Sequence, residues 1–218
     1  MARRVVVLGG GYCALYACSR FRRAVRRGKI ELTVVTKENF HIWHGFIGEM
    51  IAGKISPRNI LTPARRVFAP AKVILGIINR IDRGKKLIHF TREVDGLPDD
   101  IEYDDLIISI GTRQNTGSFP GLEQHGYKLK EWEHCFQLRN HIPRMFELAS
   151  STSDAEERKA MLTFFIAGGG FSGTEVAGEL GVLAKKITKR DYAEIDRSEV
   201  RVVLVHPGKS ILPELYGP

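Results

Sequence analysis

The chain has 218 residues, of which 43% are hydrophobic and 27% are charged, an ordinary globular composition that can bury a core. No apolar run approaches the ~20 residues of a membrane-spanning helix, and arginines followed by a strand-length apolar run do not form a signal peptide. The formal net charge is +8, but no nucleic-acid-binding signature accompanies it, so we expect no nucleic-acid partner. An early arginine cluster is either a solvated helix end or a surface for an anionic membrane.

The chain opens with a predicted strand, a glycine-rich turn and a helix. Residues 4–8 (RVVVL) predict a buried strand, a helix-compatible segment runs to Gly28, and residues 31–36 predict a second strand. The turn fits G-x-G-x-x-A, an accepted form of the dinucleotide fingerprint, through Gly9, Gly11 and Ala14. Such a turn lets the backbone approach a pyrophosphate, whose charge the N–H groups at the helix N-terminus then bind.

The next segment contains two histidines, His41 and His44, in a loop-like setting. They have no carboxylate or cysteine companions at suitable spacing, so we expect a structural or cofactor-lining role and no metal site. Ser56, followed by proline, is typical of a helix start, and the pattern predicts a helix from Ser56 to about Val67.

Short strands and turns are predicted for the middle of the chain. Residues 72–80 and 86–90 predict strands joined by a turn, and a turn-rich piece covers residues 95–100. Residues 106–110 predict a buried strand that ends in glycine and threonine. Such an end suits the edge of a ligand crevice in an open α/β sheet, or it is an ordinary strand exit.

A second fingerprint follows a predicted helix over residues 131–149 and a linker or helix extension over residues 150–159. Residues 162–167 predict a buried strand that leads into a helix continuing to about residue 190, and residues 200–206 predict the next strand. The turn fits G-x-G-x-x-G through Gly168, Gly170 and Gly173. Two fingerprints with correct flanks predict two nucleotide cofactors.

Several motifs, in this order, resemble the two-dinucleotide flavoproteins and, among them, the type II NADH dehydrogenases (NADH:quinone oxidoreductases). VVVLGGGYCALYA resembles their FAD fingerprint, YDDLIISIGT the strand that closes the first FAD segment, and LTFFIAGGGFSGTEVAGELG the NAD(P)H fingerprint. The resemblance implies an α/β fold with two Rossmann-like units. It assigns residues 1–121 to an FAD-binding domain, 122–160 to a connecting helix and linker, and 161–218 to the first βαβ of a truncated NAD(P)H-binding domain.

The resemblance also implies site residues. Those expected to contact FAD are Gly9, Gly10, Gly11, Tyr12, Cys13, Ala14, Thr36, Lys37, Ile78, Gly111 and Thr112. Those expected to receive NAD(P)H are Gly168, Gly170, Phe171, Ser172, Gly173 and His206. Glu175 matches the acidic residue near the meeting point of nicotinamide and flavin, where it would position the nicotinamide or handle a quinone proton. Alternatively, Glu175 and Glu179 form a pair of interdomain hydrogen-bonding residues.

Three features depart from the family pattern. The acid that usually ends the second strand is absent from both units, where Thr36 and His206 stand instead. With Lys209 nearby, His206 removes the repulsion that disfavours a 2′-phosphate, so the sequence allows NADPH as well as NADH. The segment FHIWHGFIGEM is bulkier and more polar than expected, and the chain ends at Pro218 without the second half of its relatives.

The sequence therefore predicts an FAD-dependent oxidoreductase that takes a hydride from NAD(P)H and passes electrons to a quinone or another small acceptor. A non-catalytic dinucleotide-binding module or a truncated fragment is the alternative. A sulfide:quinone reductase would need paired redox cysteines, and the three cysteines form no recognisable pair. We expect a cytoplasmic protein, with peripheral contact to the inner face of the cell membrane, and a homodimer or a separate C-terminal half as further partners.

Overall fold

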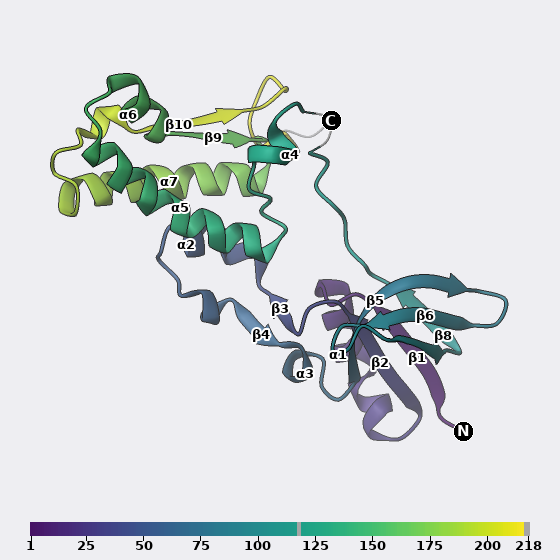
Figure 1. Cartoon of the computed structure of the whole chain (residues 1–218). Helices are drawn as coiled ribbons and strands as arrows, with labels where there is room; N and C mark the ends of the chain where they lie inside the picture. Colours follow the sequence, from purple (N-terminus) through teal and green to yellow (C-terminus); the bar gives the residue numbers. More distant parts are fainter. Residues whose placement is uncertain (117–118, 216–218) are drawn as a thin grey trace. The chain divides into compact units, whose positions relative to one another are not determined.

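Two compact units make up the chain, and each combines two stretches of sequence (Figure 1). The computed structural model describes residues 1–116 and 119–215. The first unit consists of Met1–Ile42 and Leu61–Arg113, and the second of Trp43–Ile60 and the described residues from Gln114 onward. The domain limits inferred from the sequence stay a prediction, and the last three residues of the expected NAD(P)H domain lie outside the described residues.

The first unit is built on a six-stranded sheet of order β7-β6-β5-β2-β1-β8. Four neighbouring strands are parallel: β1 (Arg3–Leu8), β2 (Ile30–Thr36), β5 (Lys72–Asp82) and β8 (Asp105–Ile108). The remaining two, β6 (Leu87–Arg92) and β7 (Pro98–Glu102), are antiparallel additions beside β5. Helix α1 (Tyr12–Arg26) connects β1 to β2, so the predicted βαβ unit is confirmed.

Both faces of the sheet are covered, which explains the unbroken apolar run of β1. Val5 and Val7 pack on one side with α1 and Phe68, while Val6 and Leu8 pack on the other with Phe90. Successive side chains of a strand point to opposite faces, so a strand buried on both sides needs an apolar residue at every position. The first glycine turn therefore starts from a rigid, buried strand.

The predicted helix from Ser56 to Val67 is wrong. The structure has a 3-10 turn (η2, Pro57–Asn59), a short strand (β4, Leu61–Pro63) and one helical turn (α3, Ala64–Val67). Pro63 explains the break, because proline lacks the N–H that a helix interior uses and disfavours helical geometry in the residue before it. Strand β4 pairs instead with β3 (Phe40–Ile42), within the segment that the sequence presented as a loop.

The turn-rich piece over residues 95–100 also differs from the prediction, because its second half belongs to strand β7. Residues Pro98–Glu102 pair with β6 at the edge of the sheet. Polar and acidic side chains are tolerated there because an edge strand has solvent on one side. Strand β8 is shorter than predicted and ends at Ile108, and it is not buried as predicted, because its residues are half-buried or exposed.

The second unit holds a two-stranded parallel sheet of β9 (Thr163–Ala167) and β10 (Arg201–Val205), connected by helix α7 (Phe171–Arg190). The second predicted βαβ unit is thus confirmed, but its first strand is not buried as predicted, because Ile166 alone among the residues of β9 is buried. The other helices are α2 (Ile47–Ile51), α4 (Leu122–His125), α5 (Trp132–Ser151) and α6 (Ala155–Met161). The described part of this unit also has four 3-10 turns: η2, given above, and η1 (His44–Phe46), η3 (Arg197–Glu199) and η4 (Pro213–Leu215). The predicted linker over residues 150–159 contains most of α6 as a separate helix.

One face of α7 supplies the core of this unit. The residues buried on it recur at helical spacing: Val176, Leu180, Ala184 and Ile187. Phe146 of α5 stacks near Phe164 of β9, with ring centroids 6.2 Å apart. Arg158 of α6 bridges several elements, since it donates to the Glu199 carboxylate at 2.6 Å and to the Ala149 carbonyl oxygen at 2.8 Å. These contacts lie near the amino ends of β9 and β10, whereas the second glycine turn starts at the carboxyl end of β9.

Candidate nucleotide-binding turns

The first glycine turn connects β1 to α1 at the carboxyl edge of the parallel strands. Gly9 has φ +102°, and a Cβ on it would lie 2.2 Å from the Ser109 carbonyl oxygen. A Cβ on Gly10 would lie 2.4 Å from Thr36 Oγ1. Gly11 differs from both, because a Cβ there would meet nothing within 4 Å. The first two glycines are thus needed for packing, while the third leaves open space beside the backbone.

The N-terminus of α1 suits an anion. Gly11 occupies the N-cap, no side chain accepts a hydrogen bond from the cap, and the first turn carries no acidic residue. The partial positive charge of the helix dipole and the amide groups is therefore not neutralised by a local carboxylate. Gly11, Tyr12, Cys13 and Ala14 lie at this end of α1, and their contacts with a pyrophosphate stay a prediction.

His41 supports the turn from within the core. Its ring is 2% exposed, and its Nδ1 lies 2.9 Å from the Gly10 carbonyl oxygen. A carbonyl oxygen can only accept, so Nδ1 carries the proton and donates it. The ring also meets Tyr12 edge-on, with centroids 5.0 Å apart. Sequence reasoning gave His41 a structural or cofactor-lining role but could not name its partner, because 31 residues separate it from Gly10.

The other predicted FAD contacts of this unit lie near the same edge. Thr36 is the last residue of β2, buried against Gly10, and the exposed Lys37 follows it. Strand β5 continues past its last pairing with β2, Thr36 with Leu75, and carries Ile78 beyond that end. Ser109 donates its N–H to the Leu8 carbonyl oxygen at 2.8 Å, which brings the chain leading to Gly111 and Thr112 beside the turn. Their roles toward FAD stay predictions.

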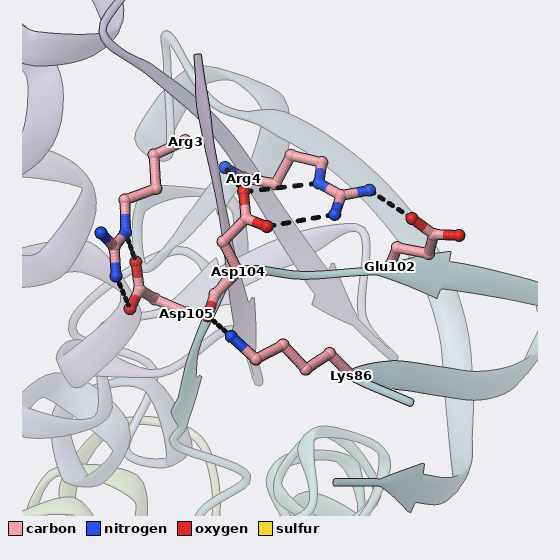
Figure 2. A network of polar contacts seen from close by, with 6 residues as sticks. All are labelled: Arg3, Arg4, Lys86, Glu102, Asp104 and Asp105. Atoms are coloured by element: carbon pink, nitrogen blue, oxygen red, sulfur yellow. Dashed lines mark hydrogen bonds and ion pairs between the residues drawn. The ribbon is translucent and has the colours of Figure 1, made fainter. Parts of the chain in front are cut away.

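A charged network at the opposite, amino edge holds β1 and β8 in register. Figure 2 shows its six residues: Arg3, Arg4, Lys86, Glu102, Asp104 and Asp105. Arg3 Nη2 donates to Asp105 at 2.8 Å and Arg4 Nη2 to Asp104 at 3.1 Å, and Arg4 also pairs with Glu102. The Arg4 guanidinium lowers the pKa of Asp104 to about 2. Because β1 and β8 flank the turn at their other ends, this network positions it from a distance.

An open cleft of about 740 Å³ lies at the same amino edge, lined by Arg4, Ile30, Leu32 and Pro70 among others. In open α/β sheets, nucleotides bind outside the carboxyl ends of the strands. The cleft is therefore on the wrong edge for the predicted cofactor, and the glycine turn remains the candidate site.

The second glycine turn connects β9 to α7 in the same way, and the start of α7 passes close to the backbone of the turn. Gly168 has φ +114°, and its N–H donates to the Val205 carbonyl oxygen at 2.8 Å. A Cβ on Gly173 would lie only 2.0 Å from the Gly168 carbonyl oxygen, whereas one on Gly168 would meet nothing within 4 Å. Gly170 occupies the N-cap of α7, whose first turn carries no acidic residue. Phe171 and Ser172 are exposed there.

The loop after β10 holds this turn through Gly169. The Gly169 N–H donates to His206 Nδ1 at 3.2 Å, and its carbonyl oxygen accepts from the Leu212 N–H at 2.7 Å. Because Nδ1 accepts, the neutral His206 ring carries its proton on Nε2. A Cβ on Gly169 would lie 2.9 Å from His206 Cγ, so the glycine leaves room for the ring. His206 thus lies beside the turn, and its predicted position at the adenosine ribose stays a prediction.

Glu175 is exposed on α7, one turn beyond the helix start. Glu179, four residues later, is paired within the same unit, because Lys54 Nζ lies 2.7 Å from its Oε2. Lys54 follows α2, which approaches α7 closely at Gly48: a Cβ there would lie 3.4 Å from Glu179 Cγ. The two carboxylates are therefore not equivalent, and the catalytic role of Glu175 stays a prediction.

The cysteines occupy different environments. Cys18 and Cys135 are buried, and burial raises the pKa of their thiols to about 11 and about 12. Cys13 is exposed at the start of α1. A thiol with a raised pKa is a poor nucleophile because little thiolate forms. Buried, protonated thiols do not suit the paired redox chemistry of the sulfide:quinone alternative.

Comparison with known proteins identifies relatives over nearly the whole chain. The family model described as pyridine nucleotide-disulphide oxidoreductase matches residues 3–217. The type II NADH:quinone oxidoreductase Ndh of Mycobacterium tuberculosis is 28% identical over 97% of this chain and 45% of its own. The external alternative NAD(P)H-ubiquinone oxidoreductase B3 of Arabidopsis thaliana mitochondria is 30% identical over 96% of this chain and 37% of its own.

A solved structure, NDH2 from Plasmodium falciparum in complex with NADH, has a TM-score of 0.87 at 20% identity. The match covers 98% of the present chain and 43% of the NDH2 chain. The present chain thus spans less than half the length of each of these relatives.

Proposed function

Because the chain belongs to the pyridine nucleotide-disulphide oxidoreductase family, we propose that it is the nucleotide-binding part of an FAD-dependent NAD(P)H:quinone oxidoreductase. One observation carries the proposal: each unit has a glycine turn between a parallel strand and an acid-free helix N-terminus. Two such turns fit two dinucleotides. The names of the relatives from Mycobacterium tuberculosis and Arabidopsis thaliana support NADH or NAD(P)H as donor and a quinone as acceptor.

In the first unit, the residues present fit FAD. The open space at Gly11 lets the backbone approach a pyrophosphate, and the α1 amide groups bind its charge. His41 keeps the Gly10 carbonyl oxygen turned inward, away from that charge. Thr36 and Lys37 would contact the ribose and adenine, and Gly111 with Thr112 would line the flavin crevice.

In the second unit, the residues present fit NAD(P)H. Gly168, Gly170 and Gly173 let α7 start against β9, so that the amide groups of Phe171 and Ser172 face the pyrophosphate. Glu175 would position the nicotinamide or hold a proton on its way to the acceptor. When bound, flavin and nicotinamide supply the hydride chemistry themselves, and the protein supplies binding and orientation.

The acceptor and the surroundings belong to the same proposal. We propose a quinone as acceptor, a cytoplasmic setting with peripheral contact to the membrane, and a second copy of the chain as partner in a homodimer. Within residues 1–116 and 119–215, no helix combines the length and apolar character needed to cross a bilayer.

A visible absorption spectrum tests the proposal. The purified chain is reconstituted with FAD, freed of excess flavin, and mixed with NADH or NADPH without oxygen. A bound flavin band that bleaches supports the oxidoreductase. A flavin band that never bleaches would leave a dinucleotide-binding module without hydride transfer, and absence of any bound flavin would overturn the proposal for this chain.

A further inference from the structure

We propose that the second nucleotide turn selects NADPH over NADH, with His206 and Lys209 recognising the 2′-phosphate of the adenosine ribose. The inference rests on the proposed function and deepens it by naming the form of the donor. The residues concerned lie in the loop that follows β10, residues 206–212 (the β10 loop).

The β10 loop lies where a Rossmann unit contacts the adenosine ribose. In such units, an acidic residue at the end of the second strand hydrogen-bonds the ribose hydroxyls of NAD, and a basic residue nearby accommodates the 2′-phosphate of NADP. Val205 ends β10 and pairs with Ala167, the last residue of β9. His206 is therefore the residue directly beside the glycine turn.

The charge of the loop favours a phosphate. Residues 200–213 contain no aspartate or glutamate, while His206 and Lys209 both lie among them and Glu214 follows. Glu199, just before this stretch, is engaged by Arg158 Nε at 2.6 Å. A carboxylate at position 206 would repel a 2′-phosphate and bind a free ribose. Without a carboxylate at position 206, the repulsion of a 2′-phosphate and the binding of a free ribose are both lost, and Lys209 attracts the phosphate.

The loop is fixed to the turn at both ends. His206 Nδ1 accepts from the Gly169 N–H, and the Leu212 N–H donates to the Gly169 carbonyl oxygen. Lys209 lies only three residues from each anchor, so its Cα is within about 10 Å of both. The exposed lysine side chain is thus confined to the neighbourhood of the turn.

His206 presents a hydrogen-bond donor in its neutral form. Because Nδ1 accepts from Gly169, the proton is on Nε2. A Cβ on Gly208 would lie 2.5 Å from that nitrogen, so any side chain at this position would clash with the ring. A phosphate binds well to an N–H donor and an ammonium group. Two free ribose hydroxyls do not require these groups.

Equilibrium binding tests the inference without requiring turnover. Calorimetric titrations of the full chain use NADPH and NADH, and then 2′,5′-ADP and 5′-ADP as probes of the adenosine half. We expect NADPH and 2′,5′-ADP to bind about tenfold or more tightly than their counterparts, the range expected for a charge-assisted hydrogen bond. The advantage should shrink with added salt.

Variants separate recognition from folding. His206→Glu keeps an acceptor for the Gly169 N–H and should reverse the preference toward NADH. His206→Gln keeps that acceptor without a charge, and Lys209→Ala changes only an exposed side chain; each should reduce the preference. Lys185→Ala, an exposed lysine of α7 outside the loop, is the matched control and should leave it unchanged.

Equal affinity for NADH and NADPH, or a preference that survives both His206→Glu and Lys209→Ala, would overturn the inference. The proposed oxidoreductase would still stand if either donor bleached the flavin. Binding of neither dinucleotide would overturn both.

Discussion

Two substitutions in the first glycine turn should affect different properties, although the glycines are only two residues apart: one should lower stability and the other FAD affinity. At Gly9, a Cβ would lie 2.2 Å from the Ser109 carbonyl oxygen, and φ is +102°. Gly9→Ala combines a left-handed backbone, about 1–2 kcal/mol, with overpacking of about 1–3 kcal/mol. The first unit should lose about 2–5 kcal/mol, which lowers its Tm by about 8 °C or more.

Gly11→Ala should fold normally. Gly11 has φ −85° and ψ −167°, an extended backbone that any residue adopts, and its Cβ would meet no atom within 4 Å. The free energy of unfolding should change by no more than about 0.5 kcal/mol. The methyl group would occupy the space that a pyrophosphate needs, so FAD affinity should fall about tenfold or more.

Thermal unfolding by circular dichroism and titration of FAD by flavin fluorescence measure the two quantities on the same samples. If Gly11→Ala melted as early as Gly9→Ala, the distinction between packing and ligand glycines would be wrong. If Gly11→Ala bound FAD as tightly as the unchanged chain, Gly11 would not lie at the pyrophosphate.

Three further predictions follow from the charged and reactive groups. Arg4 holds the pKa of Asp104 at about 2, below its unfolded value near ~3.9, so the stabilisation is complete above pH ~4 and is lost as pH falls toward 2. Urea unfolding of Arg4→Met should lack this acid dependence; an unchanged profile would refute the role of the network. Cys13 alone should react with a thiol reagent in the folded chain, more slowly when FAD is bound, and rapid labelling of Cys18 would contradict its burial. Glu175→Gln should leave NAD(P)H affinity within about twofold but slow flavin bleaching about tenfold or more. Stopped-flow absorbance measures the bleaching rate, and an unchanged rate would contradict the role of Glu175.

The two glycine turns could be predicted because their cause is local. Gly9 and Gly168 need positive φ, and Gly173 needs to cross the Gly168 carbonyl oxygen, so the sequence carries the pattern within a few residues. Strand β1 could be predicted as well, because its burial on both faces requires an uninterrupted apolar run.

The misses arise where partners are distant or where two local signals compete. The Ser-Pro start at residue 56 was outweighed by Pro63 and by pairing of β4 with β3, a tertiary contact. The hydrogen bonds from His41 to Gly10 and from Gly169 to His206 span more than 30 residues. A histidine near a strand end is the only sequence signal for either, and it does not name the partner.

The segment Trp43–Ile60 has a consequence for synthesis of the chain. Its helix α2 packs against α5 and α7, and Ile47, Met50 and Ile51 are buried there. Those helices begin at residues 132 and 171, so α2 is made roughly 80 to 120 residues before its partners. At about 5–20 residues per second, its apolar side chains stay uncovered for on the order of 4 to 24 s. During that interval the nascent chain carries a hydrophobic segment that a chaperone can bind.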